Sequence, residues 1–462
     1  MTHKPLTMME NQNVPHLVLI PPPFHGHMTP MLQLATILHS KGFSITIAHT
    51  HFNSPNPSNY PNFNFLPFFD GLSDTQITSK NFIDIASTLS TNCVTPLKET
   101  LIHHMAKLEK LDEKIACIIY DGFFHFIDSL TKELKLPSIV FRTTSATNFL
   151  TYHVCAHLQT KGYLPLQDSK SLDLVPELEL LRFKDLPIFG LTNPHDFLHS
   201  TSKTLSITPL AVIFNTVDGL EDSSLNDLQH LYNVNLFPIG PLHMIANEFD
   251  NISILREKDN CISWLNNKPR KSVLYVSLGS IASWEEKELT EMACGLVKSR
   301  QNFLWVIRPE TVTDVSAWLE SLSEDVKLGV VERGCVVKWA PQSEVLAHEA
   351  VGGFWSHCGW NSTLESLCEG VPIICQPYFG DQRVNARLLS HVWKVGLEWC
   401  NVMERNEIEK VVRRLMVNQE GEVLRKRAIE LKHEIRLSLS GSSCDALDGL
   451  VKFILSLEGS KL

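Results

Sequence analysis

Residues 17–48 read LVLIPPPFHGHMTPMLQLATILHSKGFSITIA, and this stretch sets the fold class. The apolar run at 17–20 is too short for a helix and rich in β-forming residues, so it predicts a buried strand. A loop is expected over 21–30, followed by apolar residues at helical spacing over 31–38 and a second strand over 44–48. A β-loop-α-β unit of this kind begins a parallel, doubly wound α/β sheet.

The same alternation returns along the chain. Further strands are expected at 117–120, 138–141, 273–276, 303–307, 336–337, 353–355 and 372–375. The pattern predicts two facing Rossmann-like domains with a ligand cleft at the carboxyl ends of their strands. We expect an N-terminal domain over 1–242, a linker over 243–257, a C-terminal domain over 258–440, and a final helix over 441–462 that packs back on the first domain. The region 150–235 predicts irregular helices and loops.

Composition limits the class of protein and its partners. The chain has 462 residues, 44% of them apolar and 20% charged, which is globular and long enough for two domains. A net charge of −10 without a basic stripe argues against nucleic acid and anionic membranes as partners. Eleven cysteines without a C-x-x-C pair favour a reducing compartment. We expect a cytoplasmic, monomeric protein with no stable membrane anchor.

The densest chemical signal lies in the second half. A strand at 353–355 leads through Gly359 into a helix, and a helix N-terminus binds anions with its free N–H groups. His357, Asn361 and Ser362 add donors there, so a diphosphate fits. Ser362 and Glu365 also match a capping box, and the carboxylate of Glu365 could accept hydrogen bonds from vicinal hydroxyls.

Two flanking segments carry side chains suited to a nucleotide sugar. Trp339 ends one strand, and an exposed indole there could stack on a flat base. Asp381 and Gln382 follow another strand, and an acid beside an amide suits sugar hydroxyls.

The first half offers an acid–base pair. His25 and His27 follow the first strand, and Asp121 follows another strand of the same sheet. A neutral histidine can remove a proton from an attacking hydroxyl, and an aspartate on its other nitrogen fixes the tautomer. Thr143 and Thr144 follow a third strand and could bind a sugar hydroxyl or a phosphate.

Residues 339–382 read WAPQSEVLAHEAVGGFWSHCGWNSTLESLCEGVPIICQPYFGDQ, which resembles the signature box of plant family 1 UDP-dependent glycosyltransferases of the GT-B type. The resemblance implies a UDP site and a sugar site. UDP would be bound by Ser280, Trp339, Ala340, Gln342, His357, Asn361, Ser362 and Glu365. The sugar would be bound by Trp360, Asp381, Gln382, Thr143 and Thr144.

The resemblance also implies the reaction. His27 would be the base and Asp121 its partner, although His25 stands where relatives usually carry glutamine. Gln382 at the end of the box indicates glucose as the sugar, with UDP-glucose as co-substrate and no further cofactor. No D-x-D triplet occurs, so inverting transfer without a metal is expected.

The acceptor is expected to be small and hydrophobic. Its pocket is predicted from Phe123, Phe124, Asn148, Phe379 and Gly380. A terpenoid, phenolic or flavonoid hydroxyl would fit, and so would a nitrogen of a purine-type hormone.

Other hypotheses stay open at this point. The chain could bind sugar nucleotides without catalysis, or the same fold could serve an epimerase or a phosphorylase. A metal pair at His25 and His27 is the weakest alternative because no acidic or cysteine ligand lies near it in sequence.

Overall fold

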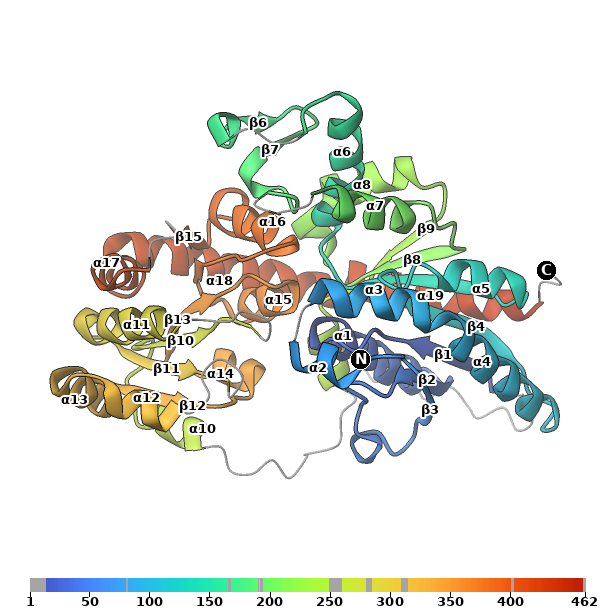
Figure 1. Ribbon diagram of the computed structural model, residues 1–462, viewed down its shortest axis with the longest axis horizontal. Coiled ribbons are helices and arrows are strands. Elements are labelled where there is room, and N and C mark those ends of the chain that lie inside the picture. The colour runs from blue at the N-terminus through green and yellow to red at the C-terminus, as the bar shows by residue number, and fades with distance from the viewer. Residues whose placement is uncertain are drawn as a thin grey trace.

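The computed structural model describes residues 14–79, 82–164, 168–189, 191, 194–248, 260–279, 285–308, 315–399 and 403–459. Two parallel sheets with helices on their faces lie side by side in it (Figure 1). The central strands of both sheets are covered by helices on both faces, and their runs of Leu, Val, Ile and Phe are almost fully buried, whereas the edge strands are partly exposed.

The first sheet is all parallel, in the order β3-β2-β1-β4-β5-β8-β9. Its strands are β1 (His16–Ile20), β2 (Ser44–Thr50), β3 (Asn64–Phe68), β4 (Ile115–Asp121), β5 (Ser138–Arg142), β8 (Ala211–Phe214) and β9 (Asn235–Pro238). Its helices are α1 (His25–Ser40), α2 (Asp74–Ser79), α3 (Phe82–Asn92), α4 (Val94–Glu109), α5 (Ile127–Glu133), α6 (Ala146–Thr160), α7 (Pro194–Leu205), α8 (Asp218–Leu231) and α9 (Leu242–Asn247). A hairpin of β6 (Leu174–Val175) and β7 (Leu178–Arg182) projects beyond α6.

The second sheet is also parallel, in the order β12-β11-β10-β13-β14-β15. Its strands are β10 (Val273–Ser277), β11 (Asn302–Val306), β12 (Gly334–Val337), β13 (Val351–Ser356), β14 (Ile373–Cys375) and β15 (Gly396–Glu398). Its helices are α10 (Asn260–Leu265), α11 (Glu286–Ser299), α12 (Val315–Ser321), α13 (Glu324–Arg333), α14 (Gln342–Ala347), α15 (Trp360–Glu369), α16 (Asp381–Arg387) and α17 (Arg405–Met416).

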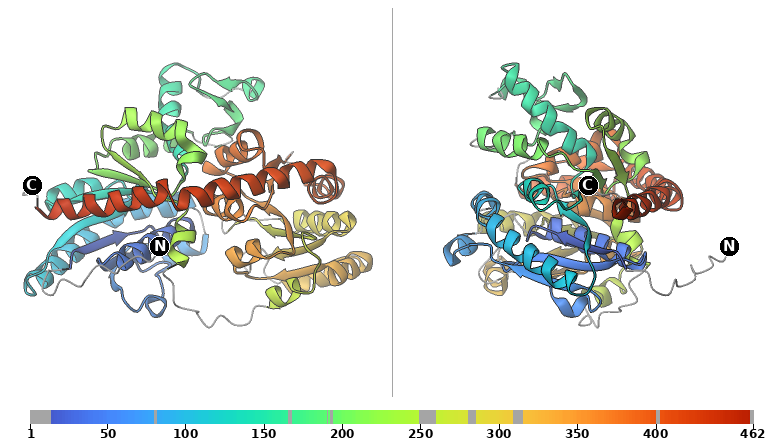
Figure 2. Two further views of the ribbon diagram at one scale, coloured as in Figure 1. Left: turned by 180° about the vertical axis from the view of Figure 1, so that it is seen from behind. Right: turned by 90° about the vertical axis from the view of Figure 1, so that its right-hand side faces the viewer.

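The last two helices join the halves. Seen from behind, α18 (Gln419–Leu439) and α19 (Ser442–Gly459) run from the second sheet back across the first (Figure 2). Leu447, Leu450 and Ile454 of α19 belong to the apolar cluster that contains Leu17 and Phe141 of the first sheet. The C-terminal helix therefore completes the core of the N-terminal half.

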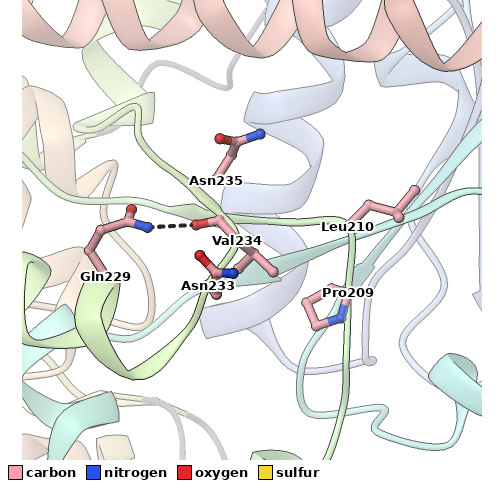
Figure 3. A pocket seen from close by; sticks show the side chains of 6 residues that line it. All are labelled: Pro209, Leu210, Gln229, Asn233, Val234 and Asn235. Atoms are coloured by element: carbon pink, nitrogen blue, oxygen red, sulfur yellow. Dashed lines mark hydrogen bonds between the residues drawn. The ribbon is translucent and has the colours of Figure 1, made fainter.

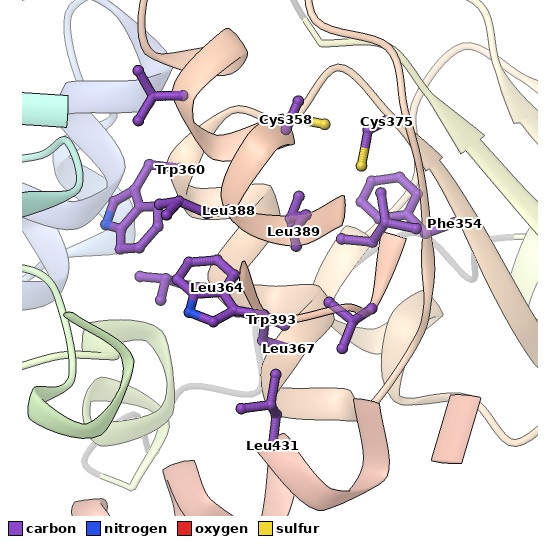
Figure 4. Close-up of a cluster of buried hydrophobic side chains, with 14 of the residues drawn as sticks. Phe354, Cys358, Trp360, Leu364, Leu367, Cys375, Leu388, Leu389, Trp393 and Leu431 are labelled. Carbon is purple, nitrogen blue, oxygen red and sulfur yellow. The ribbon is translucent and has the colours of Figure 1, made fainter. Parts of the chain in front are cut away.

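A second cluster spans both halves. Phe149 of α6 and Leu228 of α8 belong to the same buried set as Trp360, Leu364 and Trp393 of the second half. Figure 4 shows the second-half part of this cluster, with Trp360 and Trp393 at its edge. The two halves thus share a packed apolar interface.

The structure differs from the sequence expectations in three places. Helix α1 begins at His25, well before 31, so His27 lies on a helix and not in a loop. Within the region 150–235, residues 211–214 form strand β8 of the first sheet, and strand β9 begins at its end, at Asn235. The start of the expected linker, 243–247, belongs to helix α9, in which Leu242 and Ala246 are buried; residues 249–259 lie outside the described residues.

In the part of the chain that the structure describes, every helix is too short or too polar to cross a lipid bilayer.

Candidate functional site

His27 and Asp121 meet at the cleft edge of the first sheet. Nδ1 of His27 lies 2.8 Å from Oδ2 of Asp121, and the hydroxyl of Thr143 donates to the same oxygen at 3.0 Å. The backbone N–H of Phe123 donates to the other carboxylate oxygen at 2.8 Å. Because hydrogen bonds reach both of its oxygens, the carboxylate is held in place, and its bond to Nδ1 fixes the ring of His27 so that Nε2 can take a proton.

The electrostatics of the pair favour the charged forms. Burial alone would lower the pKa of His27, but the charge of Asp121 and its hydrogen bond, with a further contribution from Asp381, raise this pKa above its ordinary value. Burial would raise the pKa of Asp121, but His27, Phe123 and Thr143 together lower it. Asp121 is therefore a carboxylate at neutral pH.

His25 occupies a different place. It is the first residue of α1 and has an exposed surface. Partial desolvation of its ring by neighbouring atoms, and then the charge of Arg308, lower its pKa. No described hydrogen bond joins His25 to Asp121. The structure thus pairs His27, not His25, with the carboxylate.

One hydrogen bond connects His27's helix to the second half. Nδ2 of Asn361 donates to the backbone oxygen of Gly26 at 3.1 Å. In a regular helix that oxygen would accept from the N–H of the residue four positions on, but this residue is Pro30, which has none. The proline inside α1 therefore leaves a carbonyl free for the opposite half.

The expected anion site is formed by β13 and the start of α15. The ring of His357 lies between two glycines: a Cβ on Gly279 would come within 2.8 Å of it, and one on Gly359 within 2.5 Å. Burial and the nearby Arg308 lower the pKa of His357 to about 4, so the ring is neutral and can donate a hydrogen bond to a phosphate without adding charge. Ser280 lies outside the described residues.

The capping box expected from Ser362 and Glu365 is wrong. Helix α15 starts at Trp360 with Gly359 as its N-cap, so Ser362 is already inside the helix. Nε2 of Gln342 donates instead to Ser362 at 2.8 Å and to Glu365 at 2.5 Å, and Ser343 donates to Glu365 at 2.6 Å. Gln342 and Glu365 thus meet, as a ribose site requires.

Trp339 follows β12 and is 56% exposed, which makes its indole available for stacking. Ala340 beside it is buried, at 7%.

Of the five residues expected at the sugar, the three from the second half have different surroundings. Asp381 opens α16, and burial raises its pKa to about 6. Oε1 of Gln382 accepts from the backbone N–H of Tyr378 at 2.9 Å, which leaves its NH₂ group for a ligand. Trp360 does not fit: its side chain is 3% exposed, and Nε1 donates to the carbonyl of Asn215 at 2.7 Å in the interface between the halves.

Of the residues expected around the acceptor, some lie near His27 and others lie in the core. The ring of Phe123 lies 5.4 Å from that of His27, whereas Phe124 is fully buried in the core below the sheet and does not border a pocket. Nδ2 of Asn148 donates to Thr144 at 2.9 Å and to the hydroxyl of Tyr152 at 3.2 Å. Oδ1 of Asn148 is buried without a partner among the described atoms. Phe379 and Gly380, half-buried, precede α16.

Three further residues belong to this region. Ser343 completes the Gln342–Glu365 group and could have been found as the neighbour of Gln342. Tyr152 lies one helical turn after Asn148, and that spacing was a usable signal. Arg308 follows β11 and affects both His25 and His357, but nothing in its sequence context indicates it.

A hollow elsewhere on the molecule is not the acceptor site. About 320 Å³ in volume, it is lined by Pro209, Leu210, Gln229, Asn233, Val234 and Asn235 (Figure 3). These residues lie at the amino ends of β8 and β9, whereas His27 and Asp121 lie at the opposite edge of the sheet. No group of three or more potential metal-binding side chains occurs within the described ranges.

Comparisons with known proteins identify the class. Residues 68–431 match the family described as UDP-glucoronosyl and UDP-glucosyl transferase. UDP-glycosyltransferase 76E1 of Solanum lycopersicum is 46% identical over 446 residues, covering 96% of this chain and 92% of the relative. Flavonol 3-O-glucosyltransferase UGT76E12 of Arabidopsis thaliana is 44% identical over 450 residues, covering 96% and 97%. Phytolacca americana UGT2, solved with UDP-2-fluoro-glucose and pterostilbene, superposes with a TM-score of 0.77 at 26% identity over 96% of this chain and 100% of that one.

Two facing Rossmann-like domains of this kind define a glycosyltransferase of the GT-B class. The chain belongs to the UDP-glucoronosyl and UDP-glucosyl transferase family and is a UDP-glycosyltransferase resembling those of plants.

Proposed function

We propose that this enzyme transfers glucose from UDP-glucose to a hydroxyl of a small lipophilic acceptor and inverts the anomeric configuration. The observation that carries the proposal is the contact between the halves: Asn361, at the tip of α15, bonds to the peptide of Gly26, next to His27. This contact brings the proposed base within reach of a donor whose diphosphate sits at the helix tip.

The proton transfer follows from the geometry of His27. Because Nδ1 donates to Asp121, Nε2 carries the lone pair and accepts the acceptor's proton as its oxygen attacks the anomeric carbon. Asp121 stabilises the imidazolium that forms. Attack opposite the departing UDP converts an α-linked donor into a β-glucoside through an oxocarbenium-like transition state.

Departure of UDP needs stabilisation of negative charge. The free N–H groups at the start of α15, the ring of His357 and the guanidinium of Arg308 face that charge from the second half. Gln342, Ser343 and Glu365 would hold the ribose, and Trp339 the uracil. Transfer independent of a metal is part of the proposal, and an unchanged rate in EDTA supports it, whereas strong inhibition overturns it.

Glucose as the sugar rests on Gln382 and Asp381. The NH₂ group of Gln382 and the carboxyl of Asp381 would bind neighbouring hydroxyls of the sugar. Replacement of Gln382 by histidine should lower the use of UDP-glucose relative to other UDP-sugars, and an unaltered donor profile would contradict this assignment.

The acceptor class rests on Phe123, Tyr152 and the relatives. The Arabidopsis relative is a flavonol 3-O-glucosyltransferase and the Phytolacca protein binds pterostilbene, so phenolic acceptors are proposed first, with terpenoid alcohols next. Transfer to a nitrogen of a purine-type hormone, or sugar-nucleotide binding without transfer, are the alternatives. A monomeric, cytoplasmic enzyme is also part of the proposal.

An acceptor screen with UDP-glucose tests the function. Flavonols, stilbenes, terpenoid alcohols and purines are incubated with the enzyme, UDP release is measured and products are identified by mass spectrometry and by the anomeric NMR coupling. Binding of UDP-glucose without UDP release for any acceptor would favour the binding protein. An α-linked product would refute inversion.

A further inference from the structure

Arg142, the last residue of β5, carries a buried charge that the proposed mechanism does not use. It is 5% exposed, and no described carboxylate forms an ion pair with it. Nη2 donates to the carbonyl of Thr204 at 3.3 Å, and the guanidinium lies 4.1 Å from the ring centroid of Phe149. Nε is buried without a hydrogen-bond partner among the described atoms. Burial of a charge with so few partners lowers the stability of the fold, so the position of Arg142 needs an explanation.

The guanidinium packs against the turn that carries Asp121. A Cβ on Gly122 would lie 2.0 Å from Nη1 and 2.4 Å from Cζ of Arg142, so any larger residue there would displace the guanidinium. Gly122 follows Asp121 directly, and its N–H donates to the carbonyl of Phe141 at 3.0 Å. Phe123, on the other side of Gly122, donates to Asp121 at 2.8 Å. Arg142 therefore supports the short turn that aims the carboxylate at His27.

The charge of Arg142 also reaches Asp121. Burial lowers the pKa of Arg142, while Tyr232, Asp121, Tyr120 and Tyr152 counteract this. Those four groups come from β4, α6 and the end of α8. His153 of α6 also faces Arg142, and burial together with the charge of Arg142 lowers the pKa of His153 to about 4. The tyrosines have raised pKa values, chiefly through burial, and are neutral. Of these groups, Asp121 alone is negative at neutral pH.

We propose that Arg142 is a positioning residue of the transfer reaction: its guanidinium, packed against Gly122, fixes the turn that aims Asp121 at His27, so that the imidazole stays oriented. The inference rests on the proposed role of His27 as the base. It assigns Arg142 no contact with either substrate.

Replacement of Arg142 by methionine tests the proposal. Apolar replacement of a poorly paired buried charge is often neutral for stability, so the melting temperature should change little. We expect kcat to fall roughly tenfold, as misplacement of a catalytic group does, with little change in KM for UDP-glucose. Loss of the positive charge favours the imidazolium, so the acid limb of kcat/KM should move up by about half a pH unit.

Two variants serve as controls. Arg142→Lys keeps the charge without the flat group, so it should retain the native pH profile while kcat recovers only in part. Arg425→Met removes another arginine, which is half-buried and donates to the carbonyl of Gly352 at 3.1 Å. Because Arg425 lies far from His27 and Asp121, this variant should leave both kcat and the pH profile unchanged. The proposal is overturned if kcat of Arg142→Met falls only as much as the fraction of folded protein falls and its pH profile stays unchanged.

A double-mutant cycle tests the packing on Gly122 separately. Gly122→Ala displaces the guanidinium and should lower kcat, but in an Arg142→Ala background the added methyl group meets no obstacle. The double variant should therefore be no slower than Arg142→Ala alone. If the losses in kcat of the two single variants add in the double variant, the contact between residue 122 and the guanidinium does not cause the loss in Gly122→Ala.

Failure of the inference is distinguishable from failure of the proposed function. If the native enzyme transfers glucose and Arg142→Met equals it in kcat and pH profile, only the inference fails. If the native enzyme transfers nothing, the function fails, and NMR titration of His27 still decides the inference: an unchanged pKa in Arg142→Met overturns it, and a raised pKa supports it.

Discussion

At the scale of single residues, the pairing of one histidine with one aspartate is the most consequential feature. His27→Ala should lower kcat at least 10²-fold, because general base catalysis contributes about 10²–10⁴, while the affinity for UDP changes little. Steady-state kinetics and calorimetry of UDP binding check this. The matched control is His25→Gln, which should retain most activity because His25 lies outside the hydrogen-bonded group. Equal losses in both variants would remove His27 from its role.

The pH dependence belongs to the same pair. Asp121 raises the pKa of His27 above its ordinary value, and the base acts only when neutral. Activity should therefore be low below this pKa and rise as the pH increases through it, with the acid limb of kcat/KM above pH 6.5. Asp121→Asn removes the negative charge, so the limb should move to lower pH while kcat falls. A limb that stays in place would show that another group controls the rate.

The residues of the site differ in how far sequence could predict them. His27, Asp121 and Gln342 were accessible because each follows a strand, and Glu365 because it lies in the helix that follows one, within a recognisable motif. Trp360 and Phe124 were misplaced, because the motif names a residue but not the face on which it projects, and both side chains turn into buried packing. Arg142 and Arg308 were missed because their partners are distant in sequence.

At the scale of elements, α1 shows how one proline connects two domains. Pro30→Ala would supply an N–H to the oxygen of Gly26 and compete with Asn361. Helix stability should rise, since proline inside a helix costs about 3 kcal/mol, while kcat should fall two- to tenfold, the value of one net hydrogen bond of about 0.5–1.5 kcal/mol. Thermal melting measures the change in stability, and steady-state kinetics measures the change in kcat. Unchanged kcat with raised stability would mean that the bond does not affect the chemistry.

A buried carboxylate joins two other elements. Glu221 of α8 accepts from the backbone N–H groups of Ala146 and Thr147 at 2.9 Å each, and from Thr216 at 2.6 Å. It thereby caps the start of α6, the helix that carries Asn148 and Tyr152. Glu221→Ala should cost about 2–3 kcal/mol of stability, since charged hydrogen bonds are worth about 1.5–3, as urea unfolding would show. A loss near zero would indicate that water replaces the cap.

Element prediction succeeded where the apolar pattern was strong. The strands at 17–20, 117–120 and 273–276 stand out as apolar runs and are central in their sheets. Strands β3, β9 and β15 were missed because they are edge strands: Pro67 lies inside β3, and β9 and β15 are only four and three residues long. The start of α1 was missed because Pro30 reads locally as a helix breaker.

At the scale of the whole molecule, the interface beside the cleft couples the halves. Besides the shared apolar cluster, Arg182 and Lys184 pair with Glu398 at 3.0 and 2.6 Å, and Arg387 donates to the carbonyl of Leu180 at 2.9 Å. α19 adds apolar side chains to the core of the first half after the chain has passed through the second. Neither half is therefore complete without the other.

This shared construction predicts cooperative unfolding. Calorimetry should give one transition with a van't Hoff enthalpy close to the calorimetric value, because exposing either half opens the cluster that holds Trp360 and Trp393. Trp360→Ala should lower stability by about 3–5 kcal/mol, as large aromatic truncations do, and split the transition in two. UDP should then raise only the melting temperature of the second half. Two transitions in the native protein would show instead that the halves fold independently and that the cleft opens without cost.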